Sequence, residues 1–308
     1  MRILLFGGNG QVGWELQRAL APLGDVVAPA RREADLAAPE ALAATIRAVA
    51  PRLIVNAAAY TAVDKAESEP ALARAINATA PGVIAREAAA LGALLVHYST
   101  DYVFDGSGDA PWREDAATAP LNVYGRTKLE GEEAIRASGG PHLILRTSWV
   151  HAARGANFAS TMLRLAARRE TLDVVADQFG APTGAELLAD LTAHAVQALR
   201  TRPELGGTYH AAAAGETSWC GYARHVLAFA RDAGLALAAT PESVNAVPTS
   251  AYPTAAARPA NSRLDCSRLR TAFGLALPAW QTGVDRMLAE VLERGDIVRS
   301  SNSRPTQS

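Results

Sequence analysis

A glycine-rich stretch near the start of the chain restricts its fold more than any other feature. Residues 3–6 are an apolar run typical of a buried parallel strand. Gly7, Gly10 and Gly13 follow it with the spacing G-x-x-G-x-x-G, and a helical pattern begins at Trp14. Such glycines permit a tight turn and let backbone N–H groups approach a pyrophosphate at a helix N-terminus. The stretch predicts the start of a dinucleotide-binding fold, although an ordinary strand–turn–helix junction can have the same spacing.

Strands and helices alternate along the first half of the chain. Four further apolar runs are separated by amphipathic helices, at 26–28, 53–55, 94–97 and 143–145. This alternation predicts an α/β fold with a doubly wound, Rossmann-like parallel sheet and right-handed crossovers. We expect residues 1–150 to form the dinucleotide-binding domain, with the helix that carries Tyr124 and Lys128.

The pattern changes after residue 150. Shorter helices and strands predict a smaller C-terminal α+β region at 151–293 that mainly binds the substrate, and loss of pattern predicts a disordered tail at 294–308. Four prolines predict a loop at 240–261, and an alanine-rich pattern predicts one long helix over 70–91.

Composition excludes several functional classes. The 308 residues are 49% hydrophobic and 20% charged, and the net charge of −1 comes without a basic run, so neither a nucleic-acid surface nor an anionic-membrane surface is expected. No apolar run is long enough to span a membrane. Cys220 and Cys266 lack the spacing of a metal site and are typical of reduced thiols. These features predict a cytoplasmic protein.

Tyr124 and Lys128 are candidates for a proton-delivery pair. Their i, i+4 spacing places both side chains on one face of a helix, where the lysine charge is expected to lower the pKa of the phenol. Thr100 follows a predicted central strand and can add a third polar group at its carboxyl end. The same i, i+4 pair also occurs by chance on many helices, and a strand-end threonine can simply bond the backbone.

The end of the second predicted strand bears on the choice of cofactor. An acid there would bind the 2′-hydroxyl of an adenosine ribose, but the chain has Arg31 and Arg32 instead. Guanidinium groups suit a 2′-phosphate, so NADPH is favoured and NADH remains open. Asp35 and Leu36 come next and can line an adenine pocket.

Seven motifs together resemble the dTDP-4-dehydrorhamnose reductase family of the extended short-chain dehydrogenase/reductases. They are G-G-N-G-Q-V-G-W-E-L (7–16), V-N-A-A-A-Y-T-A-V-D-K-A-E (55–67), H-Y-S-T-D-Y-V-F (97–104), P-L-N-V-Y-G-R-T-K (120–128), R-T-S-W-V (146–150), D-Q-F-G-A-P-T (177–183) and R-P-A-N-S-R-L (258–264). The resemblance covers nearly the whole chain. It implies NADPH-dependent reduction of the C4 ketone of dTDP-4-dehydro-6-deoxy-L-mannose to dTDP-L-rhamnose, a precursor in lipopolysaccharide O-antigen synthesis.

The resemblance also implies roles for individual residues. Tyr124 would protonate the sugar's C4 oxygen, Lys128 would lower the pKa of Tyr124 and hold the nicotinamide ribose, and Thr100 would bond near the reacting oxygen. Thr100, Asp101 and Trp149 would bind the substrate. The cofactor would contact Gly7, Gly10, Gln11, Val12, Gly13, Arg31, Asp35, Leu36, Ala59, Tyr60, Thr61, Tyr98, Tyr124 and Lys128.

Some relatives form a homodimer around a magnesium ion held by glutamates. The matching residues would be Glu15, Glu186 and Glu290, which can equally be three solvated helix residues. Two positions depart from the family pattern. His151 stands where tyrosine is common, which weakens any assignment of a sugar contact there, and Ala30 replaces an acid found in some members, which strengthens the NADPH prediction.

Two other functions remain open. One is an epimerase or reductase that acts on another nucleotide sugar. The other is a non-catalytic regulatory subunit like that of methionine adenosyltransferase, whose fold is similar and which acts by binding a partner enzyme.

Overall fold

The predicted apolar runs form one parallel sheet in the computed structural model, which describes residues 1–294. Its strand order is β10-β5-β4-β3-β1-β2, and every pairing is parallel. The strands are β1 (Arg2–Phe6), β2 (Asp25–Val27), β3 (Leu53–Asn56), β4 (Leu94–Thr100), β5 (His142–Thr147) and β10 (Gly207–His210). The doubly wound α/β sheet is confirmed. Its order reverses beside β1, where open sheets of this type bind ligands.

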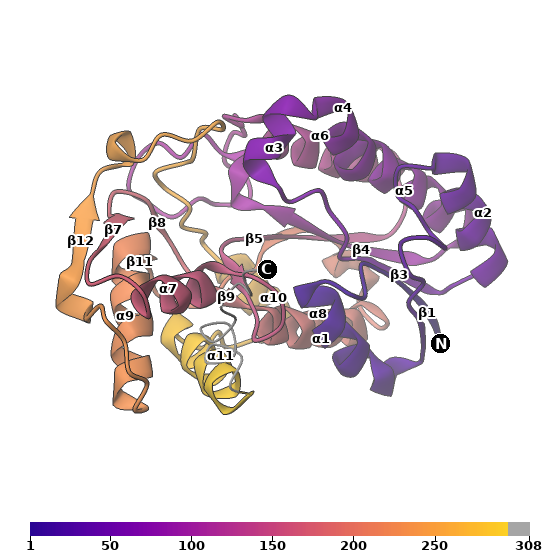
Figure 1. The fold of residues 1–308 in the computed structure, drawn as a ribbon. Helices are drawn as coiled ribbons and strands as arrows, with labels where there is room; N and C mark the ends of the chain where they lie inside the picture. The colour runs from indigo at the N-terminus through magenta and orange to yellow at the C-terminus, as the bar shows by residue number, and fades with distance from the viewer. Residues whose placement is uncertain (295–308) are drawn as a thin grey trace, which may run out of the picture.

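Each face of the sheet carries a hydrophobic core because alternate side chains of a strand point to opposite faces. In β1, Ile3 and Leu5 pack with one cluster, whereas Leu4 and Phe6 pack with another. Helices α1 (Gln11–Leu20), α8 (Ala185–Leu199) and α10 (Ser267–Phe273) cover the first face. Helices α2 (Pro39–Val49), α5 (Ala80–Leu91) and α6 (Val123–Ala137) cover the second. Figure 1 shows these two layers, with α2, α5 and α6 above the sheet and α1 and α8 below it.

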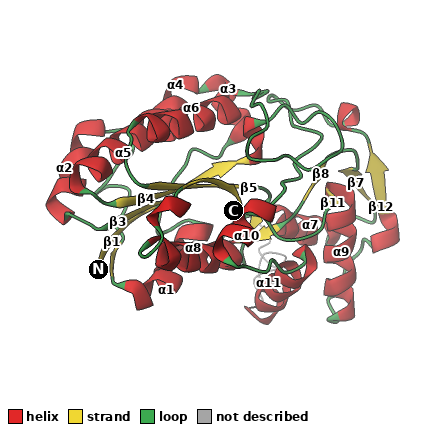
Figure 2. Cartoon of the chain, turned by 180° about the vertical axis from the view of Figure 1, so that it is seen from behind, coloured by secondary structure: helices red, strands yellow, loops and turns green. Residues whose placement is uncertain are grey.

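The C-terminal α+β region has a third core of its own. It is built from α7 (Phe158–Ala166), α9 (Trp219–Asp232) and α11 (Trp280–Arg294) with the parallel pair β7 (Leu172–Val175) and β12 (Val244–Val247). These elements lie beyond the β5 side of the sheet, as the view from behind also shows (Figure 2). Four short strands complete the region: β6 (Val150–His151), β8 (Phe179–Gly180), β9 (Thr183–Gly184) and β11 (Thr217–Ser218).

Two predicted segments differ from the structure. The expected loop at 240–261 contains β12, which fits between Pro241 and Pro248 and pairs with β7. The expected helix at 70–91 is divided into α4 (Pro70–Arg74), a π-helical turn at Ala75–Thr79, and α5. Pro81 lacks the N–H that a regular helix needs, so a wider turn before it relieves the hydrogen-bond pattern. Helix α3 (Val63–Ser68) precedes this group.

Later parts of the chain complete the sheet layers. Strand β10 pairs with β5, and α8 packs beside α1, although both follow residue 150. The predicted tail at 294–308 lies outside the described residues except for Arg294. No helix within residues 1–294 is both long and apolar enough to cross a membrane.

Candidate active site

The glycine loop joins β1 to α1 with very little space around its backbone. Gly7 has φ +83°, a left-handed conformation that favours glycine. A Cβ atom on Gly13 would lie 2.0 Å from the carbonyl oxygen of Gly7, so only glycine lets α1 pack this closely. Gly10 precedes the first turn of α1, whose unpaired N–H groups can receive a phosphate.

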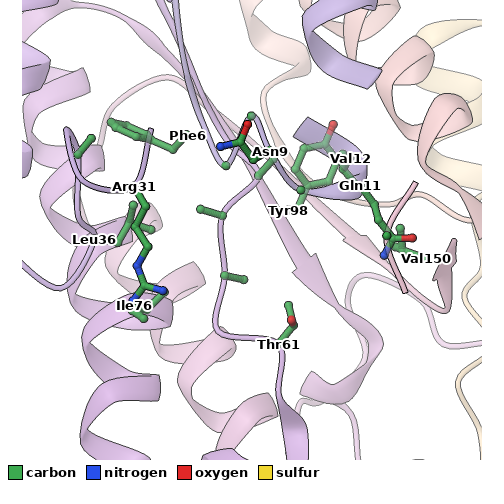
Figure 3. Close-up of a pocket in the computed structure, with 18 of the residues that line it drawn as sticks. Phe6, Asn9, Gln11, Val12, Arg31, Leu36, Thr61, Ile76, Tyr98 and Val150 are labelled. Atoms are coloured by element: carbon green, nitrogen blue, oxygen red, sulfur yellow. The ribbon is translucent and has the colours of Figure 1, made fainter. Parts of the chain in front are cut away.

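A cavity of about 790 Å³ opens at this loop, at the carboxyl ends of the central strands. That volume suits a cofactor-sized ligand. In Figure 3, Arg31, Leu36 and Ile76 lie at one end of the cavity, and Gln11 and Val150 lie at the other. Twelve of the residues expected to bind the cofactor line it: Gly7, Gly10, Gln11, Val12, Arg31, Asp35, Leu36, Ala59, Thr61, Tyr98, Tyr124 and Lys128.

Two expected cofactor residues do not line the cavity. Gly13 is instead packed against Gly7 from the first turn of α1. The hydroxyl of Tyr60 donates a hydrogen bond to Glu69 over 2.6 Å, and its backbone N–H donates to Asn77 over 2.8 Å. These bonds hold the Tyr60 hydroxyl and backbone against partners outside the cavity lining.

Several lining residues were not anticipated from the sequence. Arg154, Gly155 and Ala156 come from the loop after β6, and the Arg154 guanidinium lies 4.0 Å above the Trp14 ring. Their loop has no periodic pattern that could have revealed this return toward α1. Asn9 also lines the cavity and could have been found from its place in the glycine loop.

Tyr124 and Lys128 occupy the first turns of α6. The side chain of Asn122 caps this helix by accepting a hydrogen bond from the N–H of Gly125 over 2.8 Å. One turn apart, the phenol and the amine both reach the cavity. The sequence prediction that they share a helix face is confirmed by this placement.

Lys128 is 2% exposed and is held by β4. Its Nζ donates to the carbonyl of Tyr98 over 2.6 Å and lies 3.2 Å from Nε2 of His97. Burial lowers the pKa of Lys128 to about 8, while the nearby Glu132 carboxylate acts in the opposite direction.

The environment of Tyr124 corrects one expectation. Burial raises the pKa of Tyr124 to about 12, and a hydrogen bond with Thr100 only partly opposes that shift. The predicted lowering of this pKa by Lys128 is therefore wrong for this structure, because desolvation of the phenolate is the larger effect. Thr100 also donates to Asp101 over 3.0 Å, so β4 ends in a line of linked polar groups that leads to Tyr124.

Asp101 is a buried carboxyl group at the end of this line. It is 2% exposed, and burial raises its pKa to about 6, although hydrogen bonds with Ser262 and Thr100 act to lower it. Neither Thr100 nor Asp101 lines the cavity at the glycine loop. Both side chains are buried.

Trp149 is held in an unusual conformation. Its φ is +50°, which is strained for a large side chain, and its ring stacks on Trp219 with a centroid distance of 3.6 Å. A Cβ atom on Gly180 would lie 2.8 Å from the Trp149 ring. Trp149 does not line the cavity at the glycine loop. His151, two residues further along the chain, is buried, and neither of its ring nitrogens has a hydrogen-bond partner.

The three glutamates expected to bind magnesium do not assemble a site within one chain. Glu15 accepts a hydrogen bond from Arg18 over 3.3 Å, Glu290 pairs with Arg294, and burial raises the pKa of Glu186. Across residues 1–294, no group of three or more His, Cys, Asp or Glu side chains is arranged to hold a metal ion. A magnesium site shared by two chains stays a prediction.

Comparisons with known proteins agree with this geometry. Residues 1–293 match the family described as "RmlD substrate binding domain". The dTDP-4-dehydrorhamnose reductase of Escherichia coli (strain K12) is 58% identical over 295 residues, which are 94% of this chain and 98% of the relative.

Two solved structures support the same relationship. The dTDP-4-dehydrorhamnose reductase of Clostridium acetobutylicum superposes with a TM-score of 0.86 at 32% identity, covering 95% of this chain and 100% of that one. The Bacillus anthracis enzyme, solved in complex with NADP, has a TM-score of 0.84 at 34% identity and covers 94% and 99%.

Proposed function

The chain belongs to the RmlD substrate binding domain family and is a nicotinamide-dependent oxidoreductase, and from this premise we propose that it uses NADPH to reduce the C4 ketone of dTDP-4-dehydro-6-deoxy-L-mannose. The product is dTDP-L-rhamnose. One observation carries the proposal: Tyr124 and Lys128 open into the same cavity as the glycine loop, and Thr100 bonds to Tyr124.

The cavity suits a dinucleotide. The close-packed Gly7–Gly13 contact leaves backbone N–H groups of α1 facing the space that a pyrophosphate needs. Arg31 lines the far end, where its guanidinium can bind a 2′-phosphate, which supports NADPH over NADH. When bound, the nicotinamide supplies the hydride.

Tyr124 is the proton donor in the proposed reaction. Hydride addition to a ketone builds negative charge on oxygen, and a positioned acid relieves that charge by transferring its proton. A pKa near 12 keeps the Tyr124 phenol protonated at neutral pH, which is the form a donor requires. Thr100 orients this hydroxyl, and Lys128 lines the same cavity one helical turn away.

The sugar nucleotide is proposed to bind beyond Tyr124. Asp101 directly follows Thr100, the last residue of β4, and the strained Trp149 lies just before the C-terminal region. Residues 151–293 would form most of this substrate site, although Arg154 and Ala156 line the cofactor cavity. The relatives named above act on a dTDP-sugar by name, which supports this substrate class over other nucleotide sugars.

Replacing Tyr124 with phenylalanine tests the proposed chemistry. Tyr124→Phe removes the donor while keeping the ring, so kcat should fall by at least about 100-fold. NADPH affinity, measured by fluorescence titration, should change little because the ring remains. Turnover at the wild-type rate would contradict the role of Tyr124. Tyr102→Phe is the matched control, since Tyr102 contacts the Tyr124 ring edge-on without lining the cavity.

A further inference from the structure

Three buried polar side chains, one of them Lys128 of the catalytic pair, form a hydrogen-bonded series. Asn56 ends β3, His97 lies opposite it on β4, and Lys128 reaches His97 from α6. Their exposed fractions are only 1%, 1% and 2%. Nδ2 of Asn56 lies 3.1 Å from Nδ1 of His97, and Nε2 of His97 lies 3.2 Å from Nζ of Lys128. The N–H groups of these three side chains must therefore find their hydrogen-bond partners inside the protein.

The orientation of the Asn56 amide is set by the backbone. Its Oδ1 accepts a hydrogen bond from the N–H of Ala58 over 3.2 Å. Turning the amide over would place an NH₂ group against that N–H, donor against donor. The NH₂ group of Asn56 consequently faces His97, and Nδ1 of His97 must be the acceptor.

This assignment fixes the tautomer of His97. Burial holds the pKa of His97 well below its ordinary value, so the ring is neutral. A neutral imidazole carries one proton, which the Asn56 bond leaves on Nε2. That N–H points at Nζ of Lys128.

An Nε2–H donor suits only one form of the lysine. An ammonium group has no lone pair and would face the imidazole N–H as a second donor. A neutral amine can accept from Nε2–H and still donate to the carbonyl of Tyr98 over 2.6 Å. The hydrogen bonds around Lys128 therefore favour the uncharged amine.

We propose that His97, oriented by Asn56, is a positioning residue that sets the proton affinity of Lys128. The inference rests on the proposed function only in treating Lys128 as part of the catalytic pair. Glu132 on α6 favours the ammonium form but is itself paired with Arg146 on β5, over 2.7 Å. The effect of His97 on the protonation of Lys128 thus opposes that of Glu132, and Lys128 is balanced between its ammonium and amine forms.

The same contacts link Lys128 to the cofactor cavity. Ala58 lines that cavity, and its N–H keeps Asn56 in the orientation described above. The opposite tautomer of His97 would need the Asn56 amide to turn over and would leave the Ala58 N–H without its acceptor. A change in the cavity wall at Ala58 can therefore alter the charge of Lys128.

The tautomer can be measured directly in the wild-type protein. ¹⁵N-labelled histidine gives separate NMR signals for protonated and unprotonated ring nitrogens, and the signal lost in His97→Gln identifies His97. We expect Nε2 to carry the proton and Nδ1 to be free of it. A proton on Nδ1 would overturn the proposal, whether or not the protein proves to be a reductase.

A charge variant tests the effect on the lysine. In Asn56→Asp the new carboxylate accepts from Nδ1–H, so the lone pair of Nε2 faces Lys128 and favours its ammonium form. The titration midpoint of Lys128 should rise by about one pH unit or more. The Lys128 signal can be assigned because the chain has two lysines, and Lys65→Arg removes the ¹³C signal of the other one.

Asn77→Asp is the matched control. It adds the same buried charge, but the side chain of Asn77 bonds Tyr60 and Thr127 and makes no hydrogen bond to His97. The shift at Lys128 should be clearly smaller, and the basic limb of the kcat/KM profile should move only in Asn56→Asp. Equal shifts in both variants would overturn the proposal. If Asn56→Asp does not fold, the tautomer measurement decides.

Discussion

At the scale of single residues, burial dominates the chemistry of this site. Tyr124, Lys128 and Asp101 are all shifted toward their neutral forms, with pKa values of about 12, 8 and 6, and desolvation is the largest cause in each case. A buried charge without full compensation costs free energy. The folded protein therefore favours the neutral forms of these groups at the place where the ketone of the proposed reaction would develop charge.

Asp101 should make the folded state less stable as the pH rises. Its folded pKa of about 6 lies above the ordinary 3.8, so the folded state binds a proton more tightly than the unfolded state does. The associated stability is present below pH 3.8 and is lost as the pH rises through 6. Asp101→Asn should thus raise the free energy of unfolding at pH 8 by up to about 3 kcal/mol.

Chemical denaturation at two pH values measures this effect. The gain in Asp101→Asn should shrink toward zero at pH 4, where the wild-type carboxyl is itself largely protonated. Asp105→Asn is the control, because hydrogen bonds from Ser107 lower the pKa of Asp105 and give the opposite sign. A gain in Asp101→Asn that is the same at pH 4 and pH 8 would contradict the account.

Arg31 should determine the choice between the two nicotinamide cofactors. Its side chain lies at the far end of the cavity, and Arg31→Ala removes a cation that would face a 2′-phosphate. The ratio of kcat/KM for NADPH to that for NADH should fall by about tenfold or more. Arg32→Ala, which alters an exposed neighbour that does not line the cavity, should leave the ratio unchanged. A ratio that is equal in wild type and Arg31→Ala would refute this role.

At the scale of elements, Gly13 and Gly10 have different roles: Gly13 allows α1 to pack against β1, and Gly10 is expected to allow the cofactor to bind. A Cβ atom on Gly13 would lie 2.0 Å from a backbone oxygen, so Gly13→Ala should force α1 away from β1 and lower stability by about 1–3 kcal/mol. A Cβ atom on Gly10 would meet one atom, at 3.3 Å. Gly10→Ala should cost much less stability than Gly13→Ala and should weaken NADPH binding. Thermal unfolding and cofactor titration of both variants check this contrast, which equal stabilities would contradict.

Local sequence patterns predict those elements whose structure depends on neighbouring residues. Continuous apolar runs predicted the strands β1, β3, β4 and β5, since strands buried on both faces need apolar side chains throughout. The i, i+4 spacing placed Tyr124 and Lys128 on one helix face. The glycine spacing located the cofactor loop, because the steric demands there are local.

Features set by distant contacts could not be predicted in the same way. The Arg154 loop reaches the cofactor cavity only because α1 and the start of the C-terminal region lie together. Strand β12 forms because β7 offers it a partner. The direction of the Tyr124 pKa shift depends on how deeply α6 is buried, which no spacing reveals.

At the scale of the whole molecule, the later part of the chain contacts residues near Tyr124: Ser262 bonds to Asp101, and the carbonyl of Ala257 accepts a hydrogen bond from Asn122. Tyr124 lines the cavity at the glycine loop and is hydrogen-bonded to Thr100, which donates to Asp101. Strand β10 and helix α8 tie the later part of the chain into the sheet layers. This arrangement fits the proposed reaction, in which a cofactor and a sugar nucleotide meet at one proton donor.

The most direct test of this account is NADPH oxidation by the purified protein, followed by absorbance. The upstream dehydratase and epimerase reactions would supply the dTDP-linked 4-keto-L-sugar. The account predicts that NADPH is consumed only when this sugar is present, with one dTDP-L-rhamnose formed per NADPH. No consumption with the sugar present, or equal consumption without it, would contradict the central claim.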